Sequence, residues 1–157
     1  MKKPVVQLER TGCGIASAAA IVGLSYPEMK SIANSLGIFA HDKSLWSDTS
    51  HVRKLLRQLG VRTNSHEVPF RTWKALPDLA LLSIKWHLEK GSPYWHWAVF
   101  VRENEQSYVL DSKMGLRTNL RTDFGRMKPK WYIPVTDIKS TLGHLHERKI
   151  HDPKSKQ

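Results

Sequence analysis

The sequence contains one cysteine, Cys13, which lies between Gly12 and Gly14. Residues 14–23 are apolar, rich in alanine and bounded by glycines, a pattern typical of a buried helix whose first turn carries Cys13. The unpaired N–H groups and the dipole at a helix N-terminus stabilise a thiolate and an oxyanion. Cys13 is therefore a candidate nucleophile with a lowered pKa. The alternative is a buried structural cysteine, because free cysteine packs as a small hydrophobic side chain.

A nucleophilic thiol requires a base within hydrogen-bonding reach and a third group that orients this base. Residues 96–101 and 107–111 are rich in β-branched and aromatic side chains, and the five polar residues between them predict a hairpin. His96 opens the first strand and Asp111 closes the second, so both are expected at the same end of the hairpin. They are the candidate base and orienting group. A histidine and an aspartate that only cap strands and turns would have the same pattern.

Among the other histidines, His87 lies near the end of an expected strand and is the second candidate for the base. The remaining ones lie in expected loops, on a helix surface, or in a C-terminal tract that weakly resembles a metal-binding sequence: His41, His51, His66, His144, His146 and His151. With one cysteine, no His-Glu-x-x-His motif and no clustered carboxylates, we expect no metal site. The glycines form no phosphate loop, and thiol chemistry requires no cofactor.

Three helices are expected to position Cys13. The first spans about residues 13–22. The second begins with a capping box at residues 25–28, has apolar residues at i, i+3, i+4 and i+7, and ends before Gly37. The third repeats this spacing over residues 52–59. Residues 38–46 have no clear period and are expected to form a loop.

Strand patterns follow the helices. Residues 61–78 contain prolines and at most one short helical turn, and residues 79–84 are typical of a buried strand. Residues 131–135 predict the last strand, in which Pro134 favours a sheet edge or a strand end. Together with the hairpin, these segments predict an antiparallel sheet of about four strands. The predicted fold class is α+β, with N-terminal helices packed on a C-terminal antiparallel sheet.

The length of 157 residues, with 40% hydrophobic and 25% charged residues, is typical of one globular domain. We expect a single domain over residues 1–157, with its core at about residues 5–136 and a flexible basic tail at residues 144–157. One cysteine forms no internal disulfide, and the sequence has no signal-type or long apolar run. A cytoplasmic protein without a membrane span is therefore expected; the sequence does not define its oligomeric state.

The formal net charge of +11, from 25 Lys and Arg against 14 Asp and Glu, suits an acidic partner. Nucleic acid is disfavoured as the main partner, because the charge is spread along the chain. No Arg-rich helix, zinc-finger spacing or ribonucleoprotein-type aromatic motif accompanies it. An acidic peptide or protein substrate, or simply a solvated basic surface, fits the composition better.

Four segments occur in an informative order: Gln7, Cys13-Gly14-x-Ala16, His96-Trp97-Ala98-Val99 and Val109-Leu110-Asp111. In this order they resemble the bacteriocin-processing (double-glycine) peptidase family of papain-like cysteine peptidases. In that family a glutamine lies six positions before the cysteine, an aromatic and small apolar residues follow the histidine, and an aspartate ends the next strand. The resemblance covers about residues 5–136. Gly12 and Ser112 depart from it, since the family often has an acidic residue and a proline there.

The resemblance implies a role for each matching residue. Cys13 would be the nucleophile, His96 the general acid and base, and Asp111 the group that orients His96. Gln7 would donate a hydrogen bond to the oxyanion. This arrangement places the Cys13 sulfur within about 4 Å of one His96 ring nitrogen and Asp111 on the other. The sequence has no membrane or ATPase part like that of exporter-linked family members, so we expect a stand-alone papain-like domain.

The expected function is hydrolysis of a peptide or amide bond by a cysteine peptidase. Two alternatives stay open at this stage. The same catalytic groups pass an acyl group to an amine in a transglutaminase-like acyltransferase or an amidase. A basic binding module that keeps the fold without the activity would have the same composition.

Overall fold

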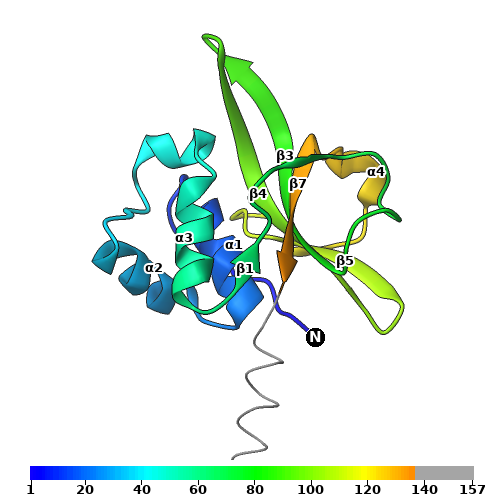
Figure 1. Ribbon diagram of the computed structural model, residues 1–157, viewed down its shortest axis with the longest axis horizontal. Coiled ribbons are helices and arrows are strands. Elements are labelled where there is room, and N and C mark those ends of the chain that lie inside the picture. The colour runs from blue at the N-terminus through cyan, green and yellow to red at the C-terminus, as the bar shows by residue number, and fades with distance from the viewer. Residues whose placement is uncertain (137–157) are drawn as a thin grey trace, which may run out of the picture.

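The computed structural model describes residues 1–136, so the expected tail at residues 144–157 lies outside the described residues. Helices come first in the chain and the sheet follows (Figure 1). The elements in chain order are α1 (Cys13–Val22), α2 (Tyr26–Ser35), the 3-10 helix η1 (Lys43–Ser47), α3 (Ser50–Gln58), β1 (Arg62–Thr63), β2 (Val68–Pro69), β3 (Leu79–Glu89), β4 (Ser92–Glu103), β5 (Gln106–Asp111), β6 (Leu120–Arg121), α4 (Phe124–Met127) and β7 (Trp131–Thr136).

The three predicted helices are confirmed. Every residue of α1 is buried, because an alanine-rich segment that is apolar on all sides can be packed on all sides. The capping box of α2 forms as predicted, with Ser25 and Glu28 each bonded to the other's backbone N–H. The loop prediction for residues 38–46 is wrong in part. Asp42 accepts a hydrogen bond from the Ser44 N–H and starts η1, which has too few residues for a hydrophobic period to be visible.

The sheet has seven strands rather than about four. The order is β1-β7-β3-β4-β5-β6, with β2 also paired to β7, and all pairs are antiparallel. The four predicted strands correspond to β3, β4, β5 and β7. The other three have two residues each. Two residues carry no alternation, so these strands could not be recognised from the pattern.

The predicted five-residue hairpin connection between β4 and β5 is wrong. The strands pair as far as Glu103 and Gln106, which leaves a two-residue turn. Asn104 and Glu105 have φ values of 51° and 64°, and two positive φ values define the type I′ turn that matches the twist of paired strands. The side chains at the exposed end of the hairpin are polar, so the sequence pattern does not distinguish these paired strand residues from a loop.

Pro134 does not place β7 at the edge of the sheet, because β7 lies between β3 and the short strands β1 and β2. Its carbonyl accepts a hydrogen bond from the Asn64 N–H, just beyond β1. The N–H and C=O of one residue in a strand point to the same side, so the missing N–H of Pro134 faces the gap between β1 and β2. The proline therefore costs no ladder hydrogen bond to β3.

The two faces of the sheet carry separate cores. Trp97 lies in the core shared with α1, α2 and α3, and Phe100 lies in the core that includes Met127 of α4. Figure 1 shows α1 to α3 on one side of the sheet and α4 on the other. Within residues 1–136, no helix has the length and apolar character needed to cross a bilayer.

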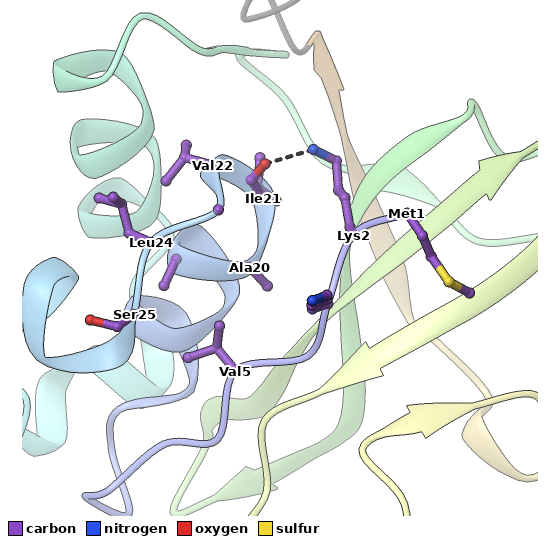
Figure 2. A pocket seen from close by; sticks show the side chains of 11 residues that line it. Met1, Lys2, Val5, Ala20, Ile21, Val22, Leu24 and Ser25 are labelled. Atoms are coloured by element: carbon purple, nitrogen blue, oxygen red, sulfur yellow. Dashed lines mark hydrogen bonds between the residues drawn. The ribbon is translucent and has the colours of Figure 1, made fainter.

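A cavity of about 450 Å³ lies where the N-terminal residues pass the C-terminal end of α1 (Figure 2). The Lys2 ammonium donates a hydrogen bond of 2.6 Å to the Ile21 carbonyl at its rim. Val5, Ala20 and Leu24 supply apolar walls. Because Cys13 is at the opposite end of α1, this cavity does not belong to the site described below.

Candidate active site

Cys13 is the first residue of α1, and Gly12 precedes it as an N-cap without a side-chain hydrogen bond. The two flanking glycines are required by close packing. A Cβ on Gly12 would approach the Tyr26 hydroxyl to less than 3.0 Å, and one on Gly14 would approach the His51 imidazole equally closely. The sequence Gly-Cys-Gly thus lets α2 and α3 pack tightly around the first turn of α1. The Cys13 side chain is held there with 1% of its surface exposed.

His96 and Asp111 come together as predicted. The distance between His96 Nε2 and Asp111 Oδ1 is 2.7 Å. In the register of the β4–β5 pair, Asp111 lies opposite Ala98, two residues after His96. Side chains two residues apart leave a strand on the same face, so His96 and Asp111 are diagonal neighbours. The pairing across the hairpin therefore brings them together even though the connecting turn differs from the predicted one.

The Cys13 thiol acts on the same imidazole, since together with Asp111 it raises the pKa of His96, and its side chain therefore lies near the ring. Since Nε2 is occupied by Asp111, Nδ1 is the ring nitrogen left for the thiol. Burial opposes the charged form of His96, but the hydrogen bonds to Asp111 and Cys13 and their negative charges outweigh it and raise the pKa of His96 to about 9. The arrangement favours the protonated form of His96 at neutral pH.

Asp111 is fully buried, and three groups satisfy its carboxylate. Oδ1 accepts hydrogen bonds from His96 and, at 3.0 Å, from the Lys113 N–H, while Oδ2 accepts one of 2.9 Å from the Arg121 guanidinium. Burial alone would raise the pKa of Asp111. The hydrogen bond and charge of His96 oppose this, together with Lys113 and Arg121, and hold the pKa well below its usual range. Asp111 is therefore ionised and fixed in orientation.

Arg121 was not identified from the sequence. It lies in the two-residue strand β6, opposite Val109 of β5, and also forms a two-pronged ion pair with Asp123 at 2.9 and 2.7 Å. Its contact with Asp111 depends on the pairing of a strand too short to predict. The only signal in the sequence, an Arg-x-Asp triplet, is common on protein surfaces.

Gln7 is buried and joined to the residue after Asp111. Its backbone N–H donates to the Ser112 carbonyl, and its side-chain Oε1 accepts a hydrogen bond of 2.8 Å from the Ser112 hydroxyl. Its Nε2 donates to the carbonyls of Glu9 and Arg10, at 2.9 and 3.0 Å. The amide is therefore fixed beside the loop that precedes Cys13. Its two N–H donors therefore point to backbone carbonyls.

Two cavities adjoin His96, of about 250 and 350 Å³. Arg10, Trp46 and Lys85 contribute to both. The smaller one is completed by His87, Glu89, Tyr94 and Trp95, and the larger one by Gln7, Lys113 and Met114.

The other histidines do not reach Cys13 in the described part of the chain. His87 is exposed and bonds to the Lys85 carbonyl and to Glu89, which together raise its pKa, so it is not placed as the base. His51, expected in a loop or on a helix surface, is instead buried against Gly14 and paired with Asp48 at 2.9 Å. Residues 1–136 contain no group of His, Cys, Asp or Glu side chains that could hold a metal ion. His144, His146 and His151 lie outside the described residues.

A helix that presents a thiol at its first turn, packed on an antiparallel sheet that carries a paired histidine and aspartate, is the papain-like arrangement. The comparison with solved structures gives the same fold. A double-glycine-motif protease from an AMS/PCAT transporter, solved with its leader peptide, has a TM-score of 0.56 at 17% identity, over 86% of this chain and 91% of that chain.

The peptidase domain of Streptococcus ComA, a bifunctional ABC transporter involved in quorum sensing, has a TM-score of 0.57 at 15% identity. This match covers 87% of this chain and 98% of that chain. No family model matches the sequence, and no curated protein matches it significantly. The chain thus has the fold of the double-glycine peptidase domains, as its sequence motifs predicted.

Proposed function

We propose that this protein is a cysteine peptidase in which Cys13 is the nucleophile, His96 the general base and acid, and Asp111 the residue that orients His96. One observation carries the proposal. The thiol at the start of α1 lies near the His96 imidazole, whose pKa it raises, and Nε2 of this imidazole is 2.7 Å from a fully buried carboxylate. Burying a carboxylate such as that of Asp111 costs free energy unless a partner compensates its charge. Here its partner is His96, and Asp111 would hold one tautomer of this proposed base.

The reaction follows from these contacts. The thiol proton passes to His96 Nδ1, and the Cys13 thiolate forms a bond to the carbonyl carbon of the substrate amide. The tetrahedral intermediate collapses as the C–N bond breaks, and His96 gives its proton to the leaving amine. His96 then removes a proton from water, which attacks the thioester. Cys13 leaves as thiolate and the acid product is released.

The oxyanion of the intermediate requires N–H donors close to the thiol. The backbone N–H of Cys13 is the first, because it is one of the groups at the start of α1 that have no partner within the helix. The Gln7 amide is the second, fixed by Ser112 on one side and by the carbonyls of Glu9 and Arg10 on the other. In the reaction one of its N–H groups would break its hydrogen bond to the Glu9 or Arg10 carbonyl and donate to the oxyanion instead.

The substrate class proposed is a polypeptide. The fold is shared with peptidase domains, one of which was solved in complex with a leader peptide. The two cavities that adjoin His96 are lined mainly by aromatic and cationic side chains, with Glu89 in the smaller one. Such surfaces accommodate an extended chain that passes across the thiol.

The test has two parts. Iodoacetamide alkylation of Cys13 is measured from pH 4 to 9 in the wild type and in His96→Ala. Hydrolysis of a proteome-derived peptide library is followed by mass spectrometry, with Cys13→Ala as the control. We expect alkylation of the wild type at neutral pH to exceed that of His96→Ala, and cleavage to disappear in Cys13→Ala. Equal alkylation rates in wild type and His96→Ala at every pH would remove His96 from the mechanism.

A further inference from the structure

The larger cavity beside His96 is lined by three cationic side chains, Arg10, Lys85 and Lys113, and by no carboxylate. We call these three residues the cationic rim. They come from the loop before α1, from within β3 and from the segment after β5. Segments far apart in the sequence thus deliver like charges to one opening of about 350 Å³.

Lys85 reaches the cavity through a distortion of the sheet. The β3–β4 pairing shifts register between Ile84 and His87, immediately after the pair formed by Ile84 and His96. Lys85 lies in this bulge with a φ of 54°, in the left-handed region that residues other than glycine rarely adopt. Bulges next to functional sites re-aim side chains, and strained residues are concentrated at such sites.

Among the described residues that line this cavity, none is an acid that could neutralise the cationic rim. Burial, and next to it the Lys113 ammonium, lower the pKa of Lys85. The nearby carboxylate of Asp111 is already bonded to His96 and Arg121. Two ammonium groups that line one small cavity repel one another unless an anion lies between or beside them.

We propose that the cationic rim is a substrate subsite for a carboxylate close to the scissile bond. The inference rests on the proposed peptidase function and specifies its substrate. The carboxylate belongs either to an Asp or Glu side chain or to the C-terminus of the substrate. An acidic peptide fits better than a nucleic acid, because the cations line a small cavity beside His96 rather than an extended surface stripe.

The first experiment compares two alkylating reagents of similar size on the intact protein, iodoacetate and iodoacetamide. In both reactions the Cys13 sulfur forms a bond to the CH₂ carbon and iodide leaves, so the two differ only in the charge of the reagent. The ratio of the two rates cancels changes in the thiol itself. We expect this ratio to fall by about two- to fivefold in Lys85→Gln and again in Lys113→Gln.

A matched control is Lys74→Gln, which removes the same charge from an exposed position outside both cavities. The Lys113→Gln change leaves the backbone N–H that bonds to Asp111 in place. An unchanged ratio in Lys74→Gln with a reduced ratio in the two rim variants supports the subsite. Equal ratios in all variants, or an equal fall in Lys74→Gln, would overturn it.

The second experiment identifies the source of the carboxylate with the proteome-derived peptide library, before and after amidation of its C-termini. Enrichment of Asp or Glu near the cleaved bond, unaffected by amidation, indicates an acidic side chain. Cleavage near the C-terminus that amidation suppresses indicates the terminal carboxylate. Cleavage without either preference would refute the subsite while the peptidase function stands. A thiol whose alkylation is unaffected by His96→Ala would instead refute the peptidase function.

Discussion

Replacing Arg121 with methionine tests whether the buried carboxylate of the site depends on a cation that the sequence did not reveal. Arg121 donates a 2.9 Å hydrogen bond to Asp111 Oδ2, and the Asp111 side chain is fully buried. Hydrogen bonds to charged groups contribute about 1.5–3 kcal/mol, and a buried acceptor left without a partner loses its solvation as well. We therefore expect Arg121→Met to lower the free energy of unfolding at pH 7 by about 2–3 kcal/mol.

Asp123→Asn is the matched control, because it removes the other ion pair of the same guanidinium. The Asp123 side chain is 42% exposed, and exposed ion pairs contribute about 0.2–1 kcal/mol. The free energy of unfolding of Asp123→Asn should therefore fall by less than about 1 kcal/mol. Urea denaturation of wild type and both variants measures the two values, provided that the m values stay equal.

The pH dependence of the Arg121→Met effect separates the electrostatic role from general loss of packing. The pKa of Asp111 is lowered on folding, so its contribution to stability is present above the unfolded pKa of about 3.9 and is lost as the pH falls. Without Arg121 that pKa is less depressed. The difference in free energy of unfolding between wild type and Arg121→Met should have its full size at pH 7 and become smaller below about pH 4. A deficit that is constant with pH, or no larger than that of Asp123→Asn, would refute the reasoning.

Three further predictions concern the thiol and its surroundings. The pKa of His96 is raised to about 9, so the protonated imidazolium stabilises the fold fully below about pH 6.5, and this stabilisation is lost as the pH rises through 9. The rate of hydrolysis in a pH–rate profile should decline over the same range. Gly14→Ala gains up to about 1 kcal/mol of helix propensity but forces a Cβ against His51, which costs about 1–3 kcal/mol or more. Thermal unfolding should show a net loss there, and no loss for Gly125→Ala, where nothing lies within 4 Å. Gln7→Ala should lower turnover by about 10²–10³-fold while leaving alkylation of the thiol intact; unchanged turnover would remove Gln7 as the oxyanion donor.

The local elements of this protein could be predicted because each depends on residues close together in the chain. The capping box at Ser25 and the apolar period of α3 both act within one or two helical turns. The order of Gln7, Cys13, His96 and Asp111 likewise indicated the fold before any geometry was known. What a sequence pattern contains is the periodicity of burial and the local preference of each backbone segment.

The tertiary structure decided what depends on pairing between distant segments. Arg121 reaches Asp111 through a two-residue strand, and Lys85 reaches the cavity through a bulge in β3. The hairpin turn at Asn104 and Glu105 was mistaken for a longer loop, yet the β4–β5 register still joined His96 to Asp111. Short strands and bulges have no period of their own, since the long strands and cores around them determine where they form. The charges around Cys13 are consequently a property of the assembled sheet, whereas Cys13, His96 and Asp111 are already indicated as candidate site residues by the sequence.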